Sequence, residues 1–353
     1  MPEIVDWDLA ALTAARLARP GPSVTFSEAA GVVSELRRLT EEAAEHVAAF
    51  TEMPPVVEAA PVQVVDRGDW AKANIAGLRK VTGPLASRMQ AVQANPVLRT
   101  VGPKVTGAQA GTVLAYMSGK VLGQYEVFSG GVGTLLLVAP NIVEVERKLN
   151  ADPRDFRMWV CLHEVTHRTQ FTAVPWMREH FFAEVNAFID ASELDPEAVA
   201  DRVRRAVSTL SDVVNDPQSR SNLLDIVQTP AQREIIDRLT ALMTLVEGHA
   251  EYVMDGVGPE VVPTVAEIRS AFNARRASAN PVEKLVRRLL GVEAKLRQYA
   301  EGRKFVAAIV DEVGMAGFNK IWTSPETLPL TSELTDPHAW VTRVHGRPAA
   351  TAE

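Results

Sequence analysis

Cysteine is almost absent from this sequence, with Cys161 the single one in 353 residues. An intrachain disulfide is therefore excluded, and this cysteine content fits a reducing compartment. Long apolar runs are also missing, because no stretch approaches the ~18 residues of a membrane-spanning helix. The N-terminus, MPEIVDWDLAALTAARLARPG, lacks the basic region and long apolar core of a signal peptide. We therefore expect a cytoplasmic protein with no membrane partner.

Basic charge is not in excess either. The 37 Lys and Arg residues face 44 Asp and Glu residues, and the net charge is −7. Nucleic-acid binding needs a dense basic surface, so we expect no nucleic-acid partner. The remaining composition, 46% hydrophobic and 23% charged, is ordinary for a globular protein. We predict one large helical domain over residues 1–353, with a division into 1–150 and 151–353 as the alternative.

Helical periodicity covers most of the chain. The segment QYEVFSGGVGTLLLVAP differs, because two β-type runs, 125–128 and 134–138, flank a glycine-rich turn and predict a hairpin. Asn141 then has the character of a helix N-cap. The segment 53–66 is expected to be a linker or a short extended piece, and loops are expected at 216–222 and 324–337. The predicted helices are 4–18, 27–51, 67–92, 105–121, 142–149, 153–171, 176–193, 196–212, 229–256, 263–275, 281–300 and 303–313.

The stretch CLHEVTHRTQF carries the strongest chemical signal in the sequence. Its histidines, His163 and His167, are four residues apart and share one face of the predicted helix 153–171. Two imidazoles one turn apart can bind the same Zn²⁺ ion. Glu164, one step around the helix, is placed to hold a metal-bound water as general base.

The alternative is a helix in which two histidines fall four apart by chance. Histidine is scarce, with seven in the chain, so a chance HExxH match is rare. The residues around the motif are apolar, and buried ionisable groups need partners, which a metal ion supplies. The sequence therefore favours a metal site.

A catalytic zinc site needs a third protein ligand, and the residues just after the motif lack the HExxHxxGxxH extension. His180 is available but has no special spacing. A stronger candidate is the stretch LMTLVEGHAEYVMDGVGP, in which Glu247, Glu251 and Asp255 fall four apart on one helix face. Such a row repels itself unless a positive charge lies opposite, which a zinc ion with its histidines would provide. The alternative is a solvated acidic face.

Together, the HExxH motif and the later Glu247-Gly-x-Ala-x-Tyr252 resemble the gluzincin pattern of zinc aminopeptidases. In those enzymes the glutamate follows HExxH by about twenty residues, whereas here it follows His167 by eighty, which implies a helical insertion over 176–230. A longer resemblance covers most of the chain. It rests on these two motifs and on the segments 101–126 and 313–329, and it points to the zincin-like metallopeptidase type 2 family of actinobacteria and relatives.

Some members of that family are labelled coenzyme F420 biosynthesis-associated proteins, but the resemblance implies only a zinc-dependent hydrolase or protease. It implies a mainly α, zincin-like fold with a small β-hairpin or sheet near the active-site helix. The expected cofactor is Zn²⁺, and the expected substrate is a peptide or a small amide.

We expect His163, His167 and Glu247 as metal ligands and Glu164 as the catalytic base. Glu251 is expected to accept a hydrogen bond from a ligand histidine and so orient its ring, with Asp255 as a further candidate. His249 and Tyr252 are candidates for stabilising an oxyanion. The hairpin could present an edge strand to an extended peptide, or serve only as scaffold.

Two other functions compete with a zinc metallopeptidase. The first is an inactive or structural metal site in a helical binding protein. The second is a zinc amidase that acts on a small molecule, which a closed pocket would favour over an open groove.

Overall fold

The computed structural model describes residues 4–54, 56, 58, 60–92, 96–128, 130–191, 229–277 and 292–346. Helices dominate this part of the chain, as the sequence predicts. The α-helices are α1 Trp7–Leu17, α2 Phe26–Thr51, α3 Arg67–Val92, α4 Pro96–Ser118, α5 Ala139–Leu149, α6 Pro153–Ala173, α7 Met177–Asp190, α10 Pro230–Gly256, α11 Val265–Ala277, α13 Val292–Phe318 and α14 Pro337–His345. Two short 3-10 helices, η2 Asn319–Trp322 and η3 Pro325–Thr327, precede α14.

A small three-stranded sheet accompanies the helices, in the order β1-β3-β2. The strands are β1 Val62–Val65, β2 Gly123–Glu126 and β3 Thr134–Val138. The predicted hairpin is β2 with β3, although β2 begins and ends two residues before the expected run 125–128. β1 lies in the segment 53–66, expected as a linker or short extended piece, and it pairs with β3 in parallel. β2 is therefore an edge strand.

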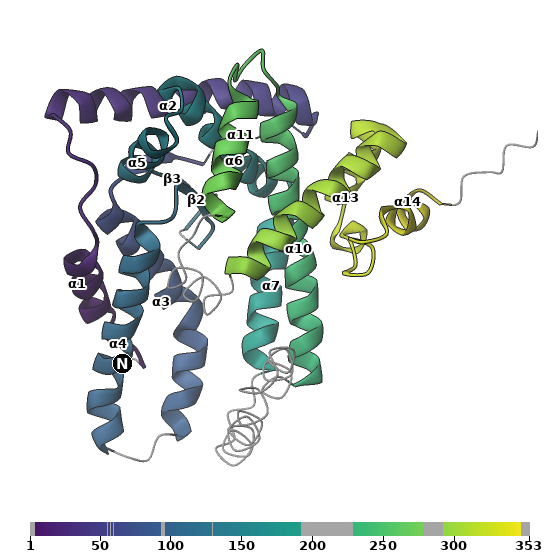
Figure 1. Ribbon diagram of the computed structural model, residues 1–353. Helices are drawn as coiled ribbons and strands as arrows, with labels where there is room; N and C mark the ends of the chain where they lie inside the picture. Colours follow the sequence, from purple (N-terminus) through teal and green to yellow (C-terminus); the bar gives the residue numbers. More distant parts are fainter. Residues whose placement is uncertain are drawn as a thin grey trace, which may run out of the picture.

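The elements are arranged around α6, as Figure 1 shows. The long helix α2 lies across one end of the molecule, with α5, α6, α11 and the sheet beside it. Two helical pairs, α3 with α4 and α7 with α10, project toward the opposite end in this view. α13 packs along α10, and α14 packs against α13. The sheet and α10 thus lie on either side of the helix that carries the HExxH motif.

Three clusters of buried apolar residues hold this arrangement together. The first joins α2, the sheet and α6, and it contains residues from both sides of position 150, such as Leu36, Leu137 and Leu162. The second joins α10, α13 and α14, and the third joins α1, α3 and α4. α6 is enclosed on most sides, because thirteen of its 21 residues are buried. The division of the chain into 1–150 and 151–353 stays a prediction.

Several predicted boundaries are wrong. Asn141 is not an N-cap: α5 begins at Ala139, and the Asn141 side chain instead donates hydrogen bonds to the carbonyls of Ser118 and Val121. α4 starts nine residues before the predicted 105 and contains Pro103. The predicted helices 281–300 and 303–313 form, from Val292 onward, one element with a non-helical residue at Gly314.

Some predictions lie outside the described residues, namely the helix 196–212, the loop 216–222 and the start of the helix 281–300. Among the helices of the described ranges, none is long and apolar enough to span a bilayer.

Candidate metal centre

Helix α6 forms where the sequence predicts it and brings the two histidines together. Asp152 caps it by accepting a hydrogen bond from the backbone N–H of Asp155, and Pro153 occupies the first turn. One turn apart on this helix, the His163 and His167 rings meet edge to face with their centroids 4.7 Å apart. Their Nε2 atoms are 3.2 Å apart. Two nitrogen lone pairs at this distance need a shared cation or a proton between them.

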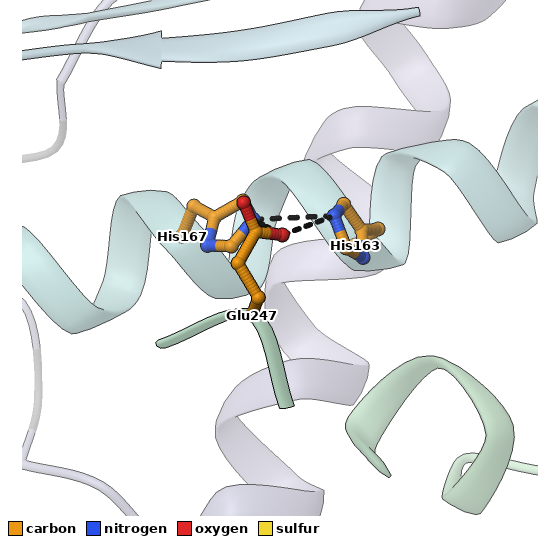
Figure 2. Close-up of side chains that lie close together, drawn as sticks. All are labelled: His163, His167 and Glu247. Atoms are coloured by element: carbon orange, nitrogen blue, oxygen red, sulfur yellow. Dashed lines mark hydrogen bonds and ion pairs between the residues drawn. The ribbon is translucent and has the colours of Figure 1, made fainter. Parts of the chain in front are cut away.

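Helix α10 supplies the third group of the site. It begins at a capping box of Thr229 and Gln232 and packs against α6. Its Glu247 carboxylate points at both histidines in Figure 2, with Oε2 3.7 Å from His163 Nε2 and 3.5 Å from His167 Nε2. In the described residues, these three side chains are the group that could hold a metal ion.

The spacing of the three atoms suits zinc. Tetrahedral ligands at metal distances of ~2.0–2.2 Å lie about 3.3–3.6 Å from one another. The observed separations are 3.2, 3.5 and 3.7 Å, so the triangle needs little adjustment to hold the ion. Two imidazole nitrogens and one carboxylate oxygen are also the donor set of a catalytic zinc site with room for a water. The geometry thus brings together the three residues predicted as ligands.

The surroundings of His167 favour its positively charged form. Burial works to lower the pKa of His167, but the hydrogen bond and the negative charge of Glu247 outweigh it, so the pKa is raised above its usual value. Glu164 adds to this effect through its own negative charge. The site therefore attracts positive charge, as a metal centre must.

Glu164, the expected base, lies on the sheet side of α6. Its side chain is only 6% exposed. It packs against Gly123, the first residue of β2: a β-carbon added there would lie 2.5 Å from Glu164 Cγ and Cδ and 2.8 Å from Oε1. A glycine at the start of the edge strand thus makes room for the carboxylate. The sequence analysis expected the hairpin near the active-site helix, but it did not single out Gly123 or its contact with Glu164.

The two faces of β2 have different neighbours. Gly123 faces Glu164, and the Tyr125 ring stacks on Phe171 of α6, with centroids 5.6 Å apart. Gln124, on the other face, exchanges hydrogen bonds with Asn74 of α3. Because side chains alternate along a strand, the outer edge of β2 lies between α6 on one face and α3 on the other.

Gln170 is a second site residue that the sequence analysis missed. It is fully buried, and its side chain connects α6 to α10. Its Oε1 is 3.0 Å from His167 Nδ1, and its Nε2 is 2.9 Å from the Val246 carbonyl and 3.0 Å from His249 Nδ1. The available signal was its position three residues after His167, which places it on the same helix face.

His249 contacts Gln170 and lies in the apolar core rather than beside the converging ligand atoms. Its ring lies 5.3 Å from the rings of both Phe318 and Trp322. Burial, aided by the nearby positive charge of His167, lowers the pKa of His249 to about 3, so the ring is neutral. These contacts describe a neutral core histidine, and a role for His249 in stabilising an oxyanion stays a prediction.

The other two acids of the α10 row are neutralised by arginines. Arg269 of α11 pairs with Glu251 at 3.5 Å and with Asp255 at 2.7 Å, and Arg303 of α13 lies 3.2 Å from Asp255. These arginines relieve the expected self-repulsion at Glu251 and Asp255, while Glu247 pairs with the two histidines. A role for Glu251 or Asp255 in orienting a ligand stays a prediction.

Tyr252, the other oxyanion candidate, is half-buried and lies against Phe50 of α2, with the ring centroids 5.8 Å apart. Its role in catalysis stays a prediction.

The position of α10 is fixed by a very close crossing with α13. A β-carbon at Gly248 would collide with the backbone of Gly302, and one at Gly302 would collide with the carbonyl of Thr244. Glycine is therefore required at both positions of the crossing. Gly248 directly follows Glu247, so the glycine of the EGxAxY stretch serves to place the ligand.

A helix-borne pair of histidines, a glutamate from a second helix and a buried glutamate beside an edge strand thus come together in one part of the fold. The chain belongs to the family of zincin-like metallopeptidases, whose match covers residues 5–341. It is also similar to the crystal structure of a proposed hydrolase with a novel fold from Chloroflexus aurantiacus. That likeness has a TM-score of 0.71 and 28% sequence identity, and it covers 98% of this chain and 100% of the other. Among curated proteins, the comparison finds no match.

Proposed function

We propose that this protein is a zinc-dependent hydrolase that cleaves amide bonds, with peptides as its substrates. The observation that carries the proposal is the convergence of His163 Nε2, His167 Nε2 and Glu247 Oε2 at zinc spacing, within reach of the charge of Glu164. Membership of the zincin-like metallopeptidase family and the likeness to a proposed hydrolase support the same reaction class.

Each residue has a distinct role in this proposal. His163, His167 and Glu247 would hold the ion. Bound zinc would lower the pKa of a water toward ~7 and polarise the scissile carbonyl. Glu164 would accept a proton from the attacking water and then donate it to the leaving amine. Its burial beside Gly123 keeps the carboxylate in one position for both transfers.

The edge strand β2 is the proposed binding site for the substrate backbone. An edge strand has unpaired N–H and C=O groups on its outer side, and an extended peptide can pair with them. Gly123 at the start of β2 touches the catalytic base, so a peptide on this edge would run close to Glu164. This arrangement favours peptides over small closed-pocket amides as substrates.

Glu164→Gln is the test of the catalytic role. We expect one zinc per chain in wild type and variant, measured by elemental analysis after dialysis, and a loss of about 10²–10⁴ in kcat/KM on a quenched fluorescent peptide library. Glu179→Gln, an exposed position on α7, is the matched control and should keep full activity. A fully active Glu164→Gln variant would refute the mechanism. A wild type that cleaves small amides but no peptides would favour the amidase alternative.

Glu247→Ala tests the third ligand. Removing one of three protein ligands should weaken zinc binding strongly, while Glu251→Ala should keep most of the affinity because Glu251 is paired with Arg269. Competition with a chromophoric chelator measures both. The reverse order of affinities would show that the ligand assignment is wrong.

A further inference from the structure

Gln170 lies at the junction of the two helices that carry the candidate ligands. Its side chain has no exposure to solvent, so all three of its hydrogen-bonding functions must be satisfied by protein. The contacts are with the His167 Nδ1 atom, the Val246 carbonyl and the His249 Nδ1 atom, all at 2.9–3.0 Å.

The Val246 carbonyl decides which way the amide of Gln170 points. A carbonyl oxygen can only accept a hydrogen bond, so the amide NH₂ group of Gln170 must face it. The second N–H of that group then donates to Nδ1 of His249. Gln170 Oε1 is left facing His167, because the reverse orientation would set two oxygens against each other.

The protonation of His167 follows from this orientation. The Oε1 atom can only accept, so Nδ1 of His167 must carry the hydrogen. In the neutral ring, Nε2 then has the free lone pair, and Nε2 is the atom that lies 3.2 Å from His163 Nε2 and 3.5 Å from Glu247 Oε2. The ring is thus held with its metal-binding nitrogen toward the other two donors.

We propose that Gln170 is a positioning residue, which holds His167 in the Nδ1–H tautomer and so presents Nε2 to the metal. This inference rests on the metal site of the proposed function. The Gln170 side chain connects the Val246 carbonyl of α10, one residue before Glu247, to the ring of the candidate ligand His167 on α6. The amide of Gln170 therefore sets the tautomer of His167 and also links α6 to α10.

Three variants separate this role from a merely structural one. Gln170→Met has a similar length but loses the acceptor. Gln170→Glu keeps an acceptor for His167 and, as the protonated acid that full burial favours, keeps one donor for the Val246 carbonyl. Thr166→Val is the matched control. Thr166 is equally buried on α6, and its hydroxyl donates to the Leu162 carbonyl of the same helix. Zinc affinity is measured by chelator competition, and the melting temperature of each metal-free protein reports its folding.

A second measurement reads the tautomer directly. In metal-free protein labelled with ¹⁵N-histidine, two-bond ¹H–¹⁵N spectra at alkaline pH show which ring nitrogen carries the proton. The chain has only seven histidines, and His167→Gln assigns the signal. We expect Nδ1–H on His167 in the wild type and in Gln170→Glu. We expect zinc binding to weaken about 10–100-fold in Gln170→Met and to stay near wild type in Gln170→Glu and Thr166→Val.

The outcomes distinguish this inference from the proposed function. Wild-type zinc affinity in a folded Gln170→Met variant, or an Nε2–H signal for His167 in the wild type, would overturn the role of Gln170 alone. If Gln170→Met does not fold, the wild-type tautomer and the affinity of Gln170→Glu decide the question. A wild type that binds zinc but hydrolyses nothing would overturn only the proposed function, and one that binds no zinc would overturn both.

Discussion

Gly123 offers a direct way to move the catalytic base without touching a metal ligand. In Gly123→Ala, the added methyl group would lie 2.5 Å from Cγ and Cδ of Glu164. Carbon atoms in contact are about 3.5–4.0 Å apart, so the carboxylate would have to shift by about 1 Å. The backbone itself accepts alanine, because Gly123 is not among the positive-φ glycines. The substitution therefore acts on Glu164 through one steric contact.

The size of the effect follows from that displacement. A misplacement of about 1 Å in a catalytic geometry lowers the rate by about 10²-fold, or about 2.7 kcal/mol in activation free energy. The ligand atoms of His163, His167 and Glu247 lie outside this contact, so zinc stoichiometry should stay at one per chain.

Steady-state kinetics on a cleavable peptide, with zinc content measured on the same samples, checks this prediction. The matched control is Gly130→Ala in the loop of the same hairpin, where an added β-carbon meets nothing within 4 Å. Wild-type kcat/KM in Gly123→Ala would refute the placement of Glu164 as the base. Equal losses in both variants would instead indicate that the hairpin as a whole had been disturbed.

Three further predictions concern packing and ionisation. Gly248→Ala should destabilise the protein by about 1–3 kcal/mol in denaturant unfolding, because it overfills the crossing with Gly302, whereas Gly31→Ala on the open face of α2 should be neutral or stabilising. Cys161 is fully buried and burial raises its pKa to about 12, so iodoacetamide should label it only after unfolding, as mass spectrometry would show. Because the pKa of His167 is raised in the folded protein, its protonation stabilises the fold. This contribution is fully present below pH ~6.5 and is lost as the pH rises through the raised pKa. The melting temperature of the metal-free protein should fall across that pH range. A His167→Gln variant whose melting temperature falls with pH as steeply as that of the wild type would contradict this.

The features that the sequence predicts well are local ones. The bounds of α6 and the pairing of His163 with His167 depend on helix periodicity and a cap, which neighbouring residues encode. The row of acids in an apolar helix indicated a positive partner, and the resemblance of the Glu247-Gly-x-Ala-x-Tyr252 stretch to the gluzincin pattern selected Glu247 from that row. These inferences need no knowledge of which elements pack together.

The features that it misses depend on contacts between distant segments. β1 is a four-residue strand that has meaning only beside β3, about seventy positions later. Arg269 and Arg303 neutralise Glu251 and Asp255 from other helices, and no local pattern marks that pairing. Gln170 reads in the sequence as one more polar helix residue, and its importance emerges only when the Val246 carbonyl is placed beside it.

The crossing of α10 with α13 has a consequence for how this protein can be divided. A fragment that ends at Gly256 contains HEVTH, Glu247 and the edge strand, so by motif it is complete. The fragment lacks α13, including the Gly302 backbone that contacts Gly248. It therefore lacks the surface against which α10 packs in the whole protein. The C-terminal helices contribute none of the expected ligands, yet α13 determines where α10 places Glu247, the expected third ligand. Shortened versions made for crystallisation or screening should therefore keep α13.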